Sequence, residues 1–136
     1  MKRECLTKAA VLAEKGAYLL IATVASGGYP HVAPAARLHI SPNEERITVD
    51  AWFCPNSLEN LEENEKVDLV VWDANLDEGY QLLGKSQGME DLALLNGYDA
   101  SLPQKPGLPQ AERRIQIRVE KVIPFQRGSH TDQEEC

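Results

Sequence analysis

The sequence lacks the excess of basic residues that binding to nucleic acid or to anionic lipid requires. It has 136 residues, of which 14 are Lys or Arg and 21 are Asp or Glu, so that its net charge is −7. Phosphate backbones and anionic headgroups are bound by clustered Lys and Arg. We therefore predict neither a nucleic-acid partner nor a membrane partner. The net charge does not exclude a small-molecule ligand.

Long hydrophobic runs are also missing. The longest apolar run, at 16–25, is about half of the roughly 20 residues that a membrane-spanning helix needs. The first residues carry charges at Glu4, Lys8 and Glu14, which interrupt the apolar core of a secretory signal. The sequence therefore predicts a cytoplasmic protein.

Cysteine and histidine are too few and too dispersed for a metal site or a disulfide framework. Cys5, Cys54 and Cys136 are an odd number without a CxxC pair, which predicts reduced thiols. His31 and His39 lie eight residues apart in one expected strand, roughly 27 Å at about 3.4 Å per residue. No metal site is predicted.

Common catalytic motifs are absent. The sequence contains no GxSxG, no Walker loop and no HExxH. Hydrolysis and phosphoryl transfer are therefore disfavoured, and the catalytic residues stay unknown.

What the sequence does contain is strand-like alternation behind one amphipathic helix. Apolar residues at helical spacing predict a helix over 1–15 that ends at Gly16. Short helices are expected from Asn56 onwards and over 89–97, and a Pro-rich loop covers 102–111. The predicted strands are 18–25, 30–40, 46–53, 66–74, 80–88 and 113–125.

These elements predict a mainly β protein, a six-stranded antiparallel barrel with peripheral helices. A flat sheet of this size would expose edges prone to aggregation, and a barrel hides them. We expect a single domain over 1–136, with a disordered tail at 126–136.

The second strand carries an unusual surface. Pro34 cannot donate a hydrogen bond to a neighbouring strand, so an edge, a bulge or a kink is expected there. On one face, Ala33 and Ala35 are flanked by His31 and Arg37. Such small residues suit either a flat aromatic ligand or a tightly packed dimer, and the pattern alone leaves both open.

The third strand leads into a helix start that suits an anion. Free N–H groups at a helix start form an anion site, to which Asn56 and Ser57 add side-chain donors. Asn56 is expected to be the N-cap. Ordinary capping without a ligand is the alternative.

In its order of elements the chain resembles the pyridoxamine 5′-phosphate oxidase-like family, the FMN-binding split β-barrels. The resemblance rests on four segments, which are "GAYLLIATVASGGYPHVAPAARLHI", "ITVDAWFCPNSLENLEENEKVDLVVWD", "YQLLGKS" and "RIQIRVEKVIPF". It implies a six-stranded split barrel that forms a homodimer and binds FMN at the subunit interface. It also implies an oxidoreductase that uses the flavin as a hydride or electron carrier, on a substrate that the sequence does not identify.

The resemblance also implies cofactor-binding positions. By this resemblance, the flavin ring and ribityl chain would be lined by Pro34, Ala35 and Ala36. The strand segment that leads to the phosphate would be Asp50, Ala51 and Trp52, and the phosphate-binding helix start would be Asn56, Ser57 and Leu58. Gln81 would reach the ring from the partner subunit.

Two positions depart from the family pattern. Many members have a small hydroxyl residue at the position of Ala51 and a Lys or Arg at that of Ser57. Arg37, Lys85 and Arg118 are the cations that could compensate. The alternatives to an FMN-dependent oxidoreductase are a non-catalytic protein that binds a flavin or another flat ligand, and a structural dimer that has lost its cofactor.

Overall fold

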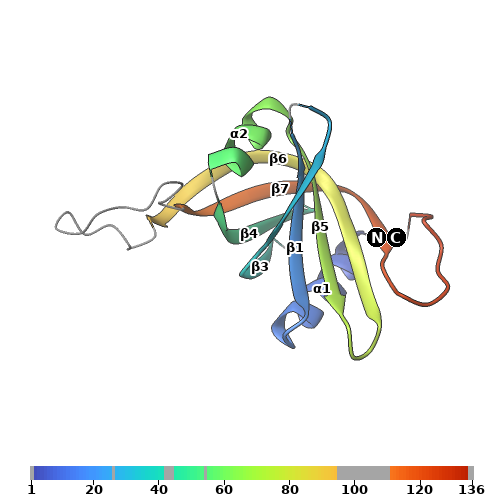
Figure 1. Cartoon of the computed structure of the whole chain (residues 1–136). Helices are drawn as coiled ribbons and strands as arrows, with labels where there is room; N and C mark the ends of the chain where they lie inside the picture. Colours follow the sequence, from blue (N-terminus) through green and yellow to red (C-terminus); the bar gives the residue numbers. More distant parts are fainter. Residues whose placement is uncertain (1, 26, 42–44, 54, 95–110, 135–136) are drawn as a thin grey trace.

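The computed structural model describes residues 2–25, 27–41, 45–53, 55–94 and 111–134. Within these residues the chain forms two helices and seven strands (Figure 1). In chain order they are α1 (Lys2–Glu14), β1 (Tyr18–Val24), β2 (Pro30–Pro34), β3 (Arg37–Ser41), β4 (Arg46–Phe53), α2 (Pro55–Glu63), β5 (Lys66–Asp73), β6 (Glu78–Leu94) and β7 (Ala111–Pro124).

Helix α1 forms and ends as its sequence predicts. It buries an apolar stripe at helical spacing, which includes Leu6, Ala9 and Leu12. Gly16 then adopts a positive φ of 91° and the Ala17 N–H donates to the Leu12 carbonyl at 3.1 Å. This is the Schellman arrangement, which requires a left-handed residue after the last turn.

All seven strands form one antiparallel sheet in the order β2-β1-β5-β6-β7-β4-β3. Six strands were predicted, and the seventh arises because the expected strand 30–40 is broken after Pro34 into β2 and β3. The two halves lie at opposite edges of the sheet although only Ala35 and Ala36 separate them in the chain. The sheet is therefore a curled, split barrel whose edges are joined by the chain and not by a ladder among the described residues. This confirms the prediction of a mainly β, antiparallel split barrel, with seven strands instead of six.

The helix predicted over 89–97 is wrong. Strand β6 continues to Leu94 and pairs with β7 as far as Leu94↔Ala111, with register shifts along the way. Pairing with a long neighbouring strand satisfies the backbone groups of this segment, which a helix of nine residues would leave largely unpaired at its ends. Residues 95–97 and most of the Pro-rich loop 102–111 lie outside the described residues.

A single hydrophobic core lies inside the curl of the sheet. Strands β1, β4, β5, β6 and β7 each bury alternate residues, and α1 contacts β3 and β5. Cys5 of α1 is fully buried and disulfide-bonded, so the prediction of reduced thiols is wrong for this residue. Cys54 and Cys136 lie outside the described residues.

The segment after β7 is attached to the turn between β5 and β6. Asp77 accepts hydrogen bonds from the backbone N–H groups of Arg127 at 2.7 Å and Gly128 at 2.9 Å. These bonds hold the pKa of Asp77 below its ordinary value. The first part of the tail that was predicted to be disordered is therefore hydrogen-bonded to the barrel.

No helix of the described residues is long and apolar enough to cross a membrane. The cytoplasmic location stays a prediction.

Glycine is required at one position of β6. A Cβ on Gly84 would collide with the Arg118 carbonyl at a register shift between β6 and β7, whereas one on Gly88 would meet nothing within 4 Å. We expect Gly84→Ala to lower the free energy of unfolding by about 1–3 kcal/mol, the usual effect of overpacking. Urea unfolding measures this, with Gly88→Ala as the matched control, and equal effects of the two variants would contradict the close approach.

Candidate functional site

The predicted flavin-lining segment lies where the two edges of the sheet meet. The Ala35 N–H donates to the Leu19 carbonyl of β1 at 2.8 Å, and the Ala36 N–H donates to the Asp50 carbonyl of β4 at 2.7 Å. Two consecutive residues thus bond to strands from opposite halves of the sheet. Pro34 and Ala36 are exposed and Ala35 is partly buried, so this crossover presents small side chains at the surface.

Beside the crossover, Asp50 is a fully buried carboxylate held by two arginines. Arg114 donates from Nε to Oδ1 at 2.8 Å and from Nη2 to Oδ2 at 3.1 Å, and Arg37 donates from Nε to Oδ2 at 2.9 Å. His39 Nε2 lies 3.6 Å from Oδ2. The hydrogen bond from Arg114 is the main reason that the pKa of Asp50 falls to about 2; Arg37 adds to it, and burial acts in the opposite direction.

The strand register explains this arrangement. Arg37, Asp50 and Arg114 are directly opposite one another on the adjacent strands β3, β4 and β7. Alternation places them on the face opposite the core residues Val49 and Ala51. One buried carboxylate thus holds two guanidinium groups, and Glu90 of β6 lies opposite Arg114 on its other side.

Four predicted positions therefore gather at the crossover: Pro34, Ala35, Ala36 and Asp50. Ala51 is next in sequence, but its side chain is fully buried in the core. Trp52 continues β4, opposite Glu112 of β7. Any contact of Ala51 with a ligand would thus use its backbone.

The predicted phosphate-binding positions of the helix start lie in α2, which comes shortly after β4 in the chain. Helix α2 begins at Pro55, so Asn56 is inside the helix and the prediction that Asn56 is the N-cap is wrong. Proline is favoured at the first helical position because the N–H that it lacks has no partner within the helix there. Ser57 and Leu58 belong to the same first turns. The helix is attached to β1 through Asn60, whose Nδ2 donates to Thr23 Oγ1 at 3.4 Å.

Gln81 is separated from this group. It lies on β6 opposite Ile123 of β7, whereas Asp50 is opposite Arg114. Nine residues of β7 separate those two partners, roughly 30 Å at about 3.3 Å per residue. Within one chain Gln81 does not reach the Asp50 cluster.

Sequence reasoning missed Arg114. Its contact with Asp50 joins residues 64 positions apart, and no local pattern predicts which strand will be the neighbour of β4. The available signal was the alternation in "RRIQIRV", which places Arg114 on the side opposite Ile115 and Ile117.

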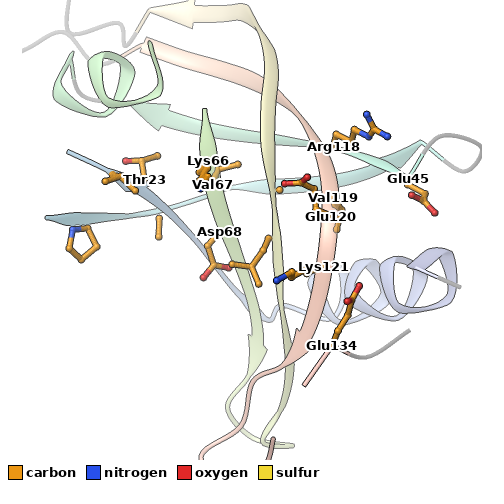
Figure 2. A pocket seen from close by; sticks show the side chains of 15 residues that line it. Thr23, Glu45, Lys66, Val67, Asp68, Arg118, Val119, Glu120, Lys121 and Glu134 are labelled. Carbon is orange, nitrogen blue, oxygen red and sulfur yellow. The ribbon is translucent and has the colours of Figure 1, made fainter. Parts of the chain in front are cut away.

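An open pocket of about 800 Å³ lies elsewhere, over β1, β5, β6 and β7 (Figure 2). None of the ten predicted cofactor-binding residues lines it. It is therefore a feature separate from the crossover site.

The split sheet with its crossover between edge strands defines an antiparallel split-barrel protein. The family model for pyridoxamine 5′-phosphate oxidase matches residues 7–125, so the chain belongs to the pyridoxamine 5′-phosphate oxidase family. This confirms the resemblance that the sequence indicated. No curated protein matches the chain.

Solved structures show the same fold. A Clostridium acetobutylicum protein related to general stress protein 26 is 16% identical with a TM-score of 0.64, over 98% of this chain and 96% of that one. An FMN-binding protein from Nostoc punctiforme is 13% identical with a TM-score of 0.63, over 98% and 93%. An F420 reductase is 16% identical with a TM-score of 0.57, over 82% and 93%.

The Asp50 cluster makes stability depend on pH. A carboxylate whose pKa falls from 3.8 to about 2 on folding stabilises the protein above about pH 4 and loses this contribution as the pH falls towards 2. The difference corresponds to about 2 kcal/mol. At neutral pH we expect Asp50→Asn to lower the free energy of unfolding by about 3 kcal/mol, because both arginines lose their counter-charge.

Urea unfolding at pH 5 and pH 2.5 measures both effects. The fall in the free energy of unfolding between pH 5 and pH 2.5 should be smaller in Asp50→Asn than in the wild type. It should be unchanged in the control Asp132→Asn, which removes an exposed carboxylate of the tail. Identical pH dependence in wild type and Asp50→Asn would contradict the assignment.

Proposed function

We propose that this protein binds a flavin, FMN, at the crossover site of a homodimer and acts as an oxidoreductase. The observation that carries the proposal is the pair of arginines held by Asp50 directly beside the small, exposed residues of the crossover. Small side chains admit a flat ring, and guanidinium groups are suited to a phosphate. Membership of the family and the FMN-binding neighbour support the cofactor.

Arg37 is the cation best placed to compensate for Ser57. It follows Ala36 in the chain and is about half exposed, while its Nε donates to Asp50. Lys85 lies on β6, with its Nζ 3.8 Å from Glu65 Oε1. Arg118 lies on β7 four residues beyond Arg114, opposite Arg46 of β4. Of the three cations that the sequence suggested, Arg37 alone adjoins predicted flavin-lining residues.

Different residues of the chain would bind the ring and the phosphate of FMN. Pro34, Ala35 and Ala36 would lie against the ring and ribityl chain, and Arg37 with the start of α2 would hold the phosphate. Asp50 would fix the position of Arg37. When bound, the flavin supplies the electron or hydride transfer, and the protein supplies position and electrostatics.

The position of Gln81 supports the homodimer. Because Gln81 is roughly 30 Å from the Asp50 cluster along β7, it would reach a flavin at the crossover only from a second copy. A site made of two subunits then explains why residues from both ends of the barrel resemble flavin-binding positions.

A structural dimer without cofactor is the second candidate. It is favoured by Ser57 in place of a cation and by the Ala51 side chain, which is buried in the core. Thermal unfolding separates the two functions, since FMN at 100 times its dissociation constant stabilises the folded state by about 2.7 kcal/mol. No shift in melting temperature with FMN would favour the structural dimer.

Removing the proposed phosphate contact should weaken FMN binding. We expect Arg37→Gln to raise the dissociation constant by about 10- to 100-fold, the usual effect of losing a charge-assisted hydrogen bond. Titration of FMN fluorescence measures this, with Lys8→Gln, an exposed cation of α1, as a control for net charge. Unchanged affinity in Arg37→Gln would contradict the role of Arg37.

A further inference from the structure

The open pocket over β1, β5, β6 and β7 is large enough for a small molecule. Its volume of about 800 Å³ lies within the range of roughly 300–1,000 Å³ that is usual for ligand sites. Charged side chains from several strands surround it (Figure 2). Which ligand it favours depends on which of these charges are shielded from water.

Most of the charges that line the pocket are in contact with water. Six charged lining residues are exposed, namely Glu45, Lys66, Arg118, Glu120, Lys121 and Glu134. Exposed charges are hydrated and screened by salt, so they contribute little to the selection of a ligand. Within the part of the chain that the structure describes, Asp68 is the one charged lining residue that is not exposed.

The carboxyl group of Asp68 has an unsatisfied oxygen. Its Oδ1 is buried and accepts no hydrogen bond among the described residues. Burial raises the pKa of Asp68 to about 6, so the group is mainly ionised at neutral pH in spite of its desolvation. A desolvated carboxylate without a donor is unfavourable, and a ligand that brings a donor would remove this cost.

Two lysines on the same face do not supply that donor. Lys66 lies two residues before Asp68 on β5, about 7 Å along the strand. Lys121 of β7 is opposite Leu83, which is opposite Asp68, so it lies two strands away, about 10 Å. Neither lysine lowers the pKa of Asp68. The counter-charge of Asp68 is therefore left for a ligand to provide.

The strand register surrounds Asp68 with apolar side chains. Ala22 of β1 is opposite Asp68 on one side, and Leu83 of β6 is opposite it on the other. Directly opposite residues share a face of the sheet, and all three line the pocket, together with Val24 and Pro30 of the β1–β2 pair. A ligand at the carboxylate would thus place its carbon skeleton against small and aliphatic side chains, which favour an apolar body.

An ammonium group matches the carboxylate chemically. It has donors and no acceptor, and charge-assisted hydrogen bonds to a carboxylate are about twice as strong as neutral ones. The last side-chain torsion of aspartate is broad and roughly two-fold, so a rotation can turn either oxygen towards the pocket. A carboxylate or phosphate at the same position would be repelled by Asp68.

We propose that this pocket binds a small organic cation, an ammonium group on an apolar body, with Asp68 as its counter-ion. The site is separate from the crossover, because none of the predicted cofactor-binding residues lines the pocket. The inference does not rest on the proposed flavin function.

Matched probes of different charge test the ligand class. Calorimetric titration of the whole protein would compare benzylamine with benzyl alcohol and benzoate, and hexylamine with hexanol and hexanoate. Each amine should bind at least about 10-fold more tightly than its alcohol, the usual effect of a charge-assisted hydrogen bond. Amines that do not bind at millimolar concentration, or alcohols or carboxylates that bind as tightly as the amines, would overturn the proposal.

Substitution of Asp68 tests the counter-ion. Asp68→Asn should raise the Kd of both amines by about 10- to 100-fold. Glu120→Gln, which removes an exposed carboxylate of the same pocket, is the matched control and should keep the Kd within about 2-fold. Ala22→Phe keeps the carboxylate but fills the space beside it, and should also raise the Kd at least about 10-fold. Circular dichroism shows which variants are folded, and wild-type affinity in a folded Asp68→Asn or Ala22→Phe would contradict the site.

Amine binding should weaken in acid. The other charged groups near Asp68 are Lys66 on its own strand, Lys85 on β6, Arg118, Glu120 and Lys121 on β7, and Glu45 and Glu134 at the rim. A cation binds the ionised form of Asp68, so the Kd should be constant above about pH 6 and rise about 10-fold per pH unit below it. Asp68→Asn should remove this dependence, and its persistence in that variant would assign the titration to another group.

FMN titrations separate this inference from the proposed function. Asp68→Asn should bind FMN as the wild type does, and saturating FMN should leave the Kd of benzylamine unchanged. Amine binding by a protein that binds no FMN would support the pocket and contradict the flavin site. Competition between benzylamine and FMN would show a shared site and overturn the proposal of a separate one.

Discussion

The buried carboxylate of Asp50 is the interaction on which the crossover depends. Its backbone carbonyl accepts from Ala36 and its side chain accepts from Arg37, so one residue of β4 holds both the crossover and the first residue of β3. Arg114 secures Asp50 in turn from β7. These bonds matter because no ladder connects β2 to β3 among the described residues. The split in the barrel is thus fixed by polar contacts on the face opposite the core.

This arrangement connects the fold to the proposed site. The same bonds that fix the split also hold two arginines beside small, exposed residues, on a chain that is acidic overall. In the proposed site, Arg37 of β3 would then supply the cation that α2 lacks at Ser57. The pocket over β1, β5, β6 and β7 is lined by none of the crossover residues.

Sequence reasoning predicted what depends on local periodicity. Alternation located the strands, Pro34 marked the break, and Gly16 marked the end of α1. It failed where distant pairing decides the outcome. The segment after Gly88 has an apolar run that suits a short helix or a strand, and only the pairing with β7 selects the strand. Arg114 and the distance from Asp50 to Gln81 depend on the order of strands in the sheet, which no spacing in the sequence records. The family resemblance supplied the flavin positions, whereas the contacts of Asp50 with both arginines became visible only in three dimensions.

The most direct test of this account compares the affinities of FMN and riboflavin, which differ only in the phosphate. If Arg37 and the start of α2 hold the phosphate beside the crossover, FMN should bind about 10- to 100-fold more tightly than riboflavin, the usual range for a charge-assisted contact. Equal affinities would contradict the phosphate site, and binding of neither flavin would contradict the proposed function altogether.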